Sequence, residues 1–170
     1  MSGGYVIAFF ETVRRSGVEA VLSHLERNGF PLTNPLTNRI TRLSPEGDQI
    51  ETPREDLVQL VASQPPGSEL SFQLWVTESV DVVCRTGRVR SGGTRFRYSL
   101  DGLATDESER LIGAITQHVT ASPPELCALV VDRRGLGEEI DWDEEVSHRR
   151  HSGDAVHCDV LFVDWWGRAE

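Results

Sequence analysis

Residues 69–78 read ELSFQLWVTE, and this stretch decides the predicted fold because its apolar residues stand at every second position. The residues between them are polar, with the exception of Trp75. Successive side chains of an extended chain point to opposite faces of a sheet, so this alternation predicts a strand with one buried face. The buried face is expected to contain Leu70, Phe72, Leu74 and Val76.

Trp75 lies on the polar face of this predicted strand, beside Ser71, Gln73 and Thr77. One interpretation is that a helix or loop of the chain covers that face and buries the indole. The other is that Trp75 is exposed and anchors a binding partner. The sequence leaves both interpretations open.

Similar patterns predict further strands, and the short turns between several of them favour antiparallel pairing. The segment 94–101 is joined to 81–86 through Gly92-Gly93, and residues 44–47 form the turn of a second hairpin. The remaining predicted strands cover residues 5–11, 39–43, 49–51, 126–132 and 156–164.

Helices are predicted where apolar residues recur at helical spacing. Residues 16–19 and 52–55 have the spacing of capping boxes, and Thr105 or Asp106 is expected to cap a third helix. Residues 133–152 are polar and are expected to be mostly loop. The predicted buried stripes are Val18, Val21, Leu22 and Leu25; Leu57, Val58, Leu60 and Val61; and Leu111, Ile112, Ile115 and Val119.

This order of elements predicts an α+β fold, with a mainly antiparallel sheet and about three helices packed on one face. The first half follows the β-α-β-β-α-β order of a ferredoxin-like unit. A length of 170 residues is most simply a single domain, residues 1–170. The Pro-Pro-Gly-Ser segment at 65–68 marks the only plausible boundary between subdomains.

The charge of the chain is unevenly distributed. There is no lysine, which excludes Schiff-base catalysis, a pyridoxal-phosphate anchor and a Walker A phosphate loop. Acidic and basic side chains balance in residues 1–100, so residues 101–170 carry the whole net charge of −10. This asymmetry predicts an acidic surface that meets something basic, within the molecule or on a partner.

Other classes of function leave little trace in the sequence. No Gly-x-Ser-x-Gly elbow or glycine-rich nucleotide loop is present, so we expect neither enzymatic activity nor a cofactor. No apolar run reaches the ~18 residues of a membrane span, and the first residues lack the features of a signal peptide. We therefore expect a cytoplasmic protein that does not contact membranes.

An arginine-rich hairpin is the most specific local feature. Arg88 and Arg90 are expected on one face of a strand, and Arg95 and Arg97 on the same face of the next. Like charges across a hairpin repel, so this face needs anions. One interpretation is that the arginines pair with the chain's own acids or stay solvated, and the other is that they bind a phosphate backbone or an acidic partner. The opposite face is expected to contain Val89, Phe96, Tyr98 and Leu100.

The segment 138–145, EEIDWDEE, is the acidic counterpart of the hairpin. It fits docking onto a basic protein, with Trp142 as the energetic centre and Asp141, Asp143 and Glu144 steering the approach. A second interpretation is a solvated loop whose Trp142 packs into the protein's own core. A third is a divalent cation site formed by alternate acids, although the EF-hand pattern is missing.

His148, His151 and His157 are weak candidates for metal ligands. The first two are spaced to share a metal on one helical turn, with His157 or its neighbour Cys158 completing the site. The arginines between the first two histidines oppose a cation there, so no metal is predicted.

Taken together, these features favour a small acidic protein-binding module. We expect it to neutralise or inhibit a basic protein, in the manner of a toxin immunity protein. One alternative is a nucleic-acid-associated protein that uses the arginine-rich hairpin, which the net charge of −10 disfavours. The other is a metal-dependent hydrolase with a site in the histidine-rich C-terminal region.

The cysteines give the first testable prediction. Cys84, Cys127 and Cys158 all lie in apolar segments predicted as strands. Burial in such surroundings raises the pKa of a thiol and makes it unreactive at neutral pH. A thiol-alkylating reagent should therefore label the native protein little before denaturant is added. Rapid stoichiometric labelling of any one cysteine under native conditions would contradict this prediction.

Overall fold

The strand predicted at residues 69–78 is present as β4 (Glu69–Trp75), an inner strand of a seven-stranded sheet. The computed structural model describes residues 3–11, 13–89, 92–121 and 126–152, with the strand order β3-β2-β4-β5-β6-β1-β7. All neighbouring strands are antiparallel. The other strands are β1 (Tyr5–Phe10), β2 (Thr41–Leu43), β3 (Gln49–Glu51), β5 (Asp81–Arg88), β6 (Thr94–Ser99) and β7 (Leu126–Asp132).

The predicted α+β class, with its mainly antiparallel sheet, is confirmed. The first half of the chain also has the predicted β-α-β-β-α-β order. The strands pair differently from those of a ferredoxin-like unit, because β1 lies between β6 and β7 and not beside the other strands of the first half. The chain therefore brings its first strand next to its last described ones.

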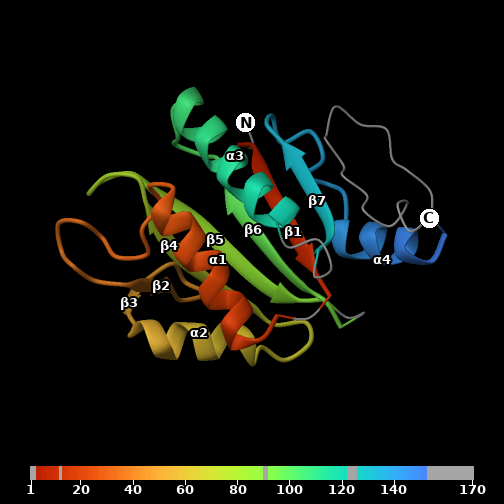
Figure 1. Ribbon diagram of the computed structural model, residues 1–170, viewed down its shortest axis with the longest axis horizontal. Helices are drawn as coiled ribbons and strands as arrows, with labels where there is room; N and C mark the ends of the chain where they lie inside the picture. Colours follow the sequence, from red (N-terminus) through yellow and green to blue (C-terminus); the bar gives the residue numbers. More distant parts are fainter. Residues whose placement is uncertain (1–2, 12, 90–91, 122–125, 153–170) are drawn as a thin grey trace.

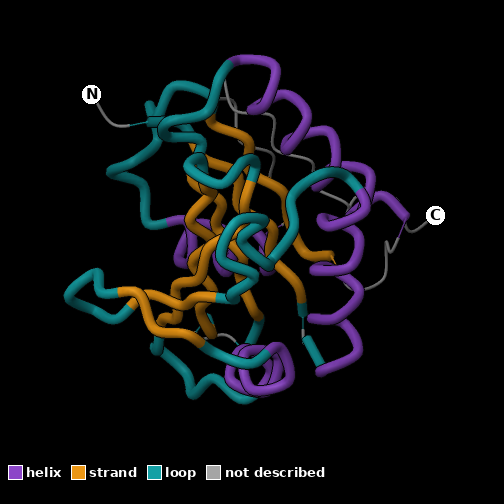
Figure 2. The backbone as a smooth tube through the Cα atoms, turned by 90° about the vertical axis from the view of Figure 1, so that its left-hand side faces the viewer, coloured by secondary structure: helices purple, strands orange, loops and turns teal. Residues whose placement is uncertain are grey.

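Helices cover one face of the sheet, as the apolar patterns predict (Figures 1 and 2). Their buried side chains meet Phe72, Phe96 and other residues of the sheet in the larger of two hydrophobic clusters. Arg54 joins the first two helices through ion pairs to Glu19 at 2.9 Å and to Glu26 at 2.7 Å. The helices of this layer are α1 (Arg15–Arg27), α2 (Arg54–Ala62) and α3 (Thr105–Ala121).

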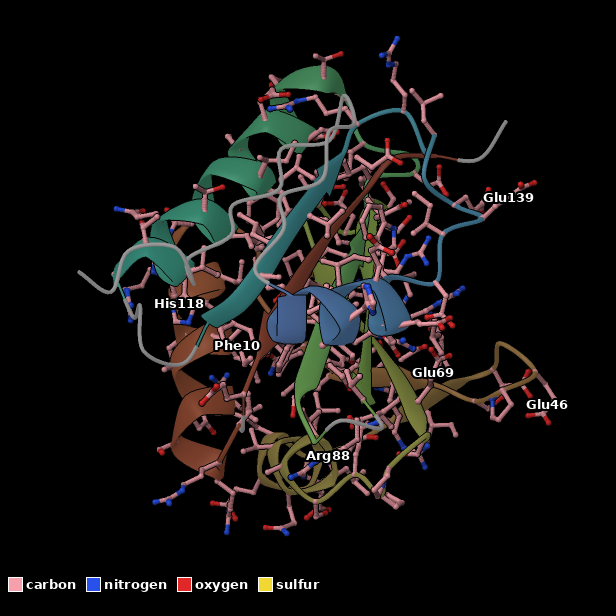
Figure 3. The ribbon with its side chains drawn as sticks, turned by 90° about the vertical axis from the view of Figure 1, so that its right-hand side faces the viewer. Phe10, Glu46, Glu69, Arg88, His118 and Glu139 are labelled. Carbon is pink, nitrogen blue, oxygen red and sulfur yellow. The ribbon has the colours of Figure 1, made fainter. Side chains whose placement is uncertain are left out.

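A further helix, α4 (Trp142–Ser152), lies across the opposite face of the sheet (Figure 3). It corrects the expectation that residues 133–152 are mostly loop. The sequence shows no helical pattern here because, among the described side chains of α4, only Trp142 and Val146 belong to the core, and two apolar positions form no periodic stripe. They belong to a second, smaller cluster, whose other members are Tyr5, Ile7, Phe9, Val89, Ala128 and Val130.

The predicted capping boxes are wrong. α1 begins at Arg15, so Ser16 already lies inside the helix, and Arg14 at the N-cap makes no side-chain capping bond. Pro53 occupies the N-cap of α2, while the Thr52 hydroxyl donates to the carbonyl of Ile50 at 3.2 Å. A capping oxygen must stand at the N-cap itself, and in both helices the predicted residue is displaced by one or two positions.

α3 begins at Thr105, so neither Thr105 nor Asp106 occupies its N-cap position. The backbone N–H of Ala104 instead donates to the Glu107 carboxylate at 2.8 Å, which is the glutamate half of a capping box. The predicted buried stripes are confirmed except at Leu60, which is 41% exposed.

Trp75 and Cys84 lie inside the protein. Trp75 is only 7% exposed, so the chain itself covers that face and the interpretation as an exposed anchor is wrong. Cys84 is a free, fully buried thiol, and burial raises its pKa well above the ordinary value. The structure does not describe the side chain of Cys127, and Cys158 and the predicted strand 156–164 lie outside the described residues.

The segment 65–68 is a loop between α2 and β4, and the strands before and after it belong to the same sheet. Gly67 donates its backbone N–H to the carbonyl of Arg88, which ties this loop to the end of β5. Within the described ranges, no helix combines the length and the apolar character that crossing a bilayer requires.

The contact between α1 and α3 predicts a dependence of stability on pH. The rings of His24 and His118 lie 5.1 Å apart between these helices. Burial, together with the nearby charges of His24 and Arg27, lowers the pKa of His118 below 6.5. As the pH falls below 6.5, the unfolded chain binds a proton at His118 that the folded chain resists, so the free energy of unfolding decreases.

Urea unfolding at about pH 7.5 and about pH 5.5 measures this loss. In His118→Gln the titrating group is gone, so the difference between the two pH values should shrink relative to the original protein. An equal difference in both proteins would contradict the assignment to His118.

Candidate functional site

Trp142, the first residue of α4, attaches this helix to the sheet. Trp142 is 5% exposed, and its indole N–H donates to the hydroxyl of the buried Tyr5 at 2.8 Å. Gly137 fits against both rings, since a Cβ there would lie 2.9 Å from Trp142 and 3.0 Å from the Tyr5 hydroxyl. The proposed role of Trp142 as the energetic centre of an interface is therefore wrong, and the alternative of packing into the protein's own core is confirmed.

A buried carboxylate fixes the loop that precedes α4. Asp132, at the end of β7, accepts hydrogen bonds from the backbone N–H groups of Arg134 at 3.1 Å and Gly137 at 2.7 Å. Burial raises the pKa of this carboxyl group, but the backbone N–H groups of residues 134–137 outweigh it, so the net pKa is lowered. The carboxylate also interacts with the hydroxyl of Tyr5. The loop, the first strand and α4 thus share one polar network.

The loop fixed by this network contains an exposed leucine. Leu136 lies within the loop wrapped around Asp132, yet its side chain is 66% exposed. Glu138 and Glu139 follow it and are also exposed, and Figure 3 shows Glu139 on a loop that projects beside α4. An apolar side chain is therefore presented to solvent on a backbone that internal hydrogen bonds fix.

The second half of the acidic segment, residues 142–145, forms the first turn of α4. Asp141 caps α4, because its carboxylate accepts the backbone N–H of Glu144 at 3.1 Å. Asp141 and Glu144 are exposed, whereas Asp143 is half-buried and forms an ion pair with Arg95. We define the acidic surface as the exposed carboxylates of Glu138, Glu139, Asp141 and Glu144.

The predicted face of four arginines is wrong in its register. Arg88 lies opposite Thr94 in the β5–β6 ladder, and Gly87 lies opposite Arg95. Arg88 therefore belongs to the row of Thr94 and Phe96 and not to that of Arg95. Because Val89 and Gly93 close the turn through a hydrogen bond of 2.8 Å, residues of equal parity share a face.

The arginines that do share a face are Arg85, Arg95 and Arg97. They lie on the α4 side of the sheet, in line with Val89, which packs in the smaller cluster and not with Phe96 and Tyr98 as predicted. Arg90 lies outside the described residues. Sequence reasoning missed Arg85 as a member of this row. The Val89–Gly93 turn fixes the register, and that register places Arg85 opposite Arg97.

Arg95 connects the two charged features of the chain. Its guanidinium forms ion pairs with both Glu69 on β4 and Asp143 on α4. This confirms, for Arg95, the interpretation in which the arginines pair with the chain's own acids. The ion pair also removes Asp143 from the carboxylates available to a partner.

The structure brings no metal-binding cluster together among the residues that it describes. His148 is an exposed residue of α4, the side chain of His151 is not described, and His157 lies outside the described residues. The alternative cation site in the acidic segment finds no support, since Asp141 caps the helix and Asp143 binds Arg95.

Comparisons with known proteins give one structural likeness. No protein-family model matches the sequence, and no curated protein sequence matches it. The chain is similar to a solved structure described as the toxic C-terminal tip of CdiA from Pseudomonas aeruginosa in complex with immune protein. The TM-score is 0.38 and the sequence identity 12%, over 75% of this chain and 84% of that chain.

The buried carboxylate yields the prediction for this site. In Asp132→Asn an amide N–H replaces one of two accepting oxygens, so a backbone N–H of the loop faces a donor. We expect a loss of about 2 kcal/mol in the free energy of unfolding near neutral pH, the usual effect of leaving such a group unsatisfied. Urea unfolding measures the loss, and Asp101→Asn, at an exposed position, is the control.

The difference in stability between the original protein and Asp132→Asn should also depend on pH. Because the pKa of Asp132 is lowered on folding, its carboxylate stabilises the fold above its ordinary pKa and loses that effect as the pH falls through the lowered value. The gap in stability between Asp132→Asn and the original protein should therefore narrow in acid. A gap that stays constant down to about pH 3 would show that charge at Asp132 contributes nothing.

Proposed function

We propose that this chain is a protein-binding module that docks a basic protein on the acidic surface, with Leu136 as the apolar anchor. The observation that carries the proposal is the exposure of Leu136, at 66%, on a loop held by the buried Asp132. Interfaces gain most of their affinity from a few apolar anchors surrounded by polar residues. Leu136 beside Glu138 and Glu139 has this arrangement.

Preorganisation supports the proposal. Association normally loses free energy when loops become ordered at an interface. Here the backbone of residues 134–137 is bound to Asp132, and the neighbouring helix is held by Trp142 under its first turn. A partner would therefore find the loop already in one conformation.

Charge supports a basic partner. The acidic surface lies within residues 101–170, which carry the whole net charge of −10. Exposed carboxylates at the rim of an interface accelerate the approach of a cationic protein more than they strengthen the complex. Leu136 would then determine how long the complex lasts, and the acidic surface how fast it forms.

The finer form of the proposal is neutralisation of a basic toxin in the cytoplasm, in the manner of an immunity protein. Such a protein acts by covering its partner and needs a preformed surface without catalytic groups of its own. The free, buried Cys84 fits a reducing compartment. The nucleic-acid alternative loses support, because Arg95 is bound to carboxylates and Arg88 lies in a different row.

The experiment begins with capture of the partner from the native host, using the full chain as bait. With the purified partner, Leu136→Ala should weaken the complex about tenfold, mainly through faster dissociation, because it removes the anchor. Surface plasmon resonance gives both rate constants. Leu36→Ala is the matched control, since Leu36 is 75% exposed on the loop between α1 and β2.

The amide variants Glu138→Gln and Glu139→Gln separate the two roles. Together they should slow association and flatten its dependence on salt, with a smaller effect on dissociation. If Leu136→Ala and Leu36→Ala behave alike while both remain folded, the proposed anchor is wrong. Capture of an acidic protein or of nucleic acid in place of a basic protein would contradict the proposed partner class.

A further inference from the structure

The arginine row contains a second candidate site, which shares only Glu138 with the acidic surface. Arg85 on β5 and Arg97 on β6 lie directly opposite each other in the ladder. We propose that this pair binds a carboxylate group, and that the ligand is a small zwitterion carrying an ammonium group beside that carboxylate. The proposal does not depend on the proposed function, since it concerns a ligand of this chain alone.

The charges of this pair are not neutralised within the described ranges. No carboxylate oxygen there lies within 4.0 Å of the guanidinium nitrogens of Arg85 or Arg97. Arg95, the next residue of the same row, is bound to both Glu69 and Asp143. Like charges directly opposite on a sheet repel, so an anion placed between Arg85 and Arg97 would relieve a repulsion that Arg95 does not experience.

Stacking orients one of the two guanidinium groups. Arg97 lies over the ring of Tyr5, with its central carbon 4.1 Å from the ring centroid. Tyr5 is itself fixed, because Trp142 donates to its hydroxyl. A stacked guanidinium is held through its face and keeps the N–H groups of its edge for a ligand, which is the geometry that binds carboxylates through two hydrogen bonds.

A cavity of about 330 Å³ adjoins the pair. Arg85, Arg97, Tyr5 and Ser99 line it, and so do the carboxylates of Asp81, Asp101 and Glu138. This volume is at the lower end of the range for small-molecule sites, roughly 300–1,000 Å³, and suits an amino acid or a dipeptide.

The carboxylates in the lining decide the class of ligand. A multiply charged anion would be repelled by Asp101 and Glu138, both of which are exposed at the cavity. A ligand with one carboxylate and one ammonium group meets opposite charges at both ends. Asp81 is already hydrogen-bonded by the Gln73 amide at 2.8 Å, so Asp101 and Glu138 are the carboxylates expected to meet the ammonium group.

Three matched probes test the charge requirements on the isolated protein. Glycylglycine carries both charges, N-acetylglycine only the carboxylate, and glycinamide only the ammonium group. Binding is followed by chemical-shift changes of the backbone amides of β5 and β6 at constant ionic strength. Glycylglycine should give saturable shifts, N-acetylglycine should bind more weakly, and glycinamide should give no saturable shift on these strands.

Variants then assign the binding to the pair. Arg97→Gln and Arg97→Lys should each weaken glycylglycine binding about tenfold, because both lose the stacked, two-bond geometry and the second keeps the charge. Arg15→Gln, which removes an exposed arginine on α1, is the control and should bind normally. Glu138→Gln should reduce the preference for glycylglycine over N-acetylglycine.

The results distinguish a wrong ligand class from a wrong site. If N-acetylglycine binds as tightly as glycylglycine, the zwitterionic class is wrong. If no probe saturates, or if Arg15→Gln weakens binding as much as Arg97→Gln, the site itself is overturned. The partner-binding proposal survives either result, because its anchor and its steering charges are tested with a different ligand and, apart from Glu138, with different residues.

Discussion

The hydrogen bond from the indole of Trp142 to the hydroxyl of Tyr5 is the contact on which the face opposite the three-helix layer depends. It connects a helix near the end of the described chain to its first strand, between residues 137 positions apart. The hydroxyl of Tyr5 also interacts with Asp132, which holds the intervening loop. The ring of Tyr5 stacks against the guanidinium of Arg97. The loop, α4 and the guanidinium of Arg97 thus all contact one network around a buried tyrosine.

The three arginines of this face differ in their surroundings. Arg95 uses its charge internally, joining β4 to α4 through Glu69 and Asp143. Arg85 and Arg97, in the same row, keep theirs directed at the cavity. A shift of the register by one residue would move all the arginines of the shifted strand to the opposite face of the sheet, since neighbouring strand residues point to opposite faces. The register therefore determines which arginines lie on the face of α4 and the cavity.

Much of the fold could be predicted from the sequence, because its strands and first three helices bury regular apolar patterns. The strand at 69–78 and the stripe of α3 are examples. The site could be predicted only in part. The acidic character of segment 138–145 is evident from the sequence, but α4 has too few apolar residues to show a helical period. Without that period, Asp141 cannot be distinguished as a cap among the neighbouring acids. Leu136, a lone apolar residue among polar ones, carries no pattern at all.

The two hydrophobic clusters lie on opposite faces of one sheet, and they are unequal in size. The larger joins the three-helix layer to the sheet and contains most of the buried apolar residues of the two clusters, so it contributes most to the stability of the fold. The smaller lies beneath the surfaces proposed for recognition. Such a division would let the exposed residues of the loop and of α4 change while the other layer keeps the protein folded.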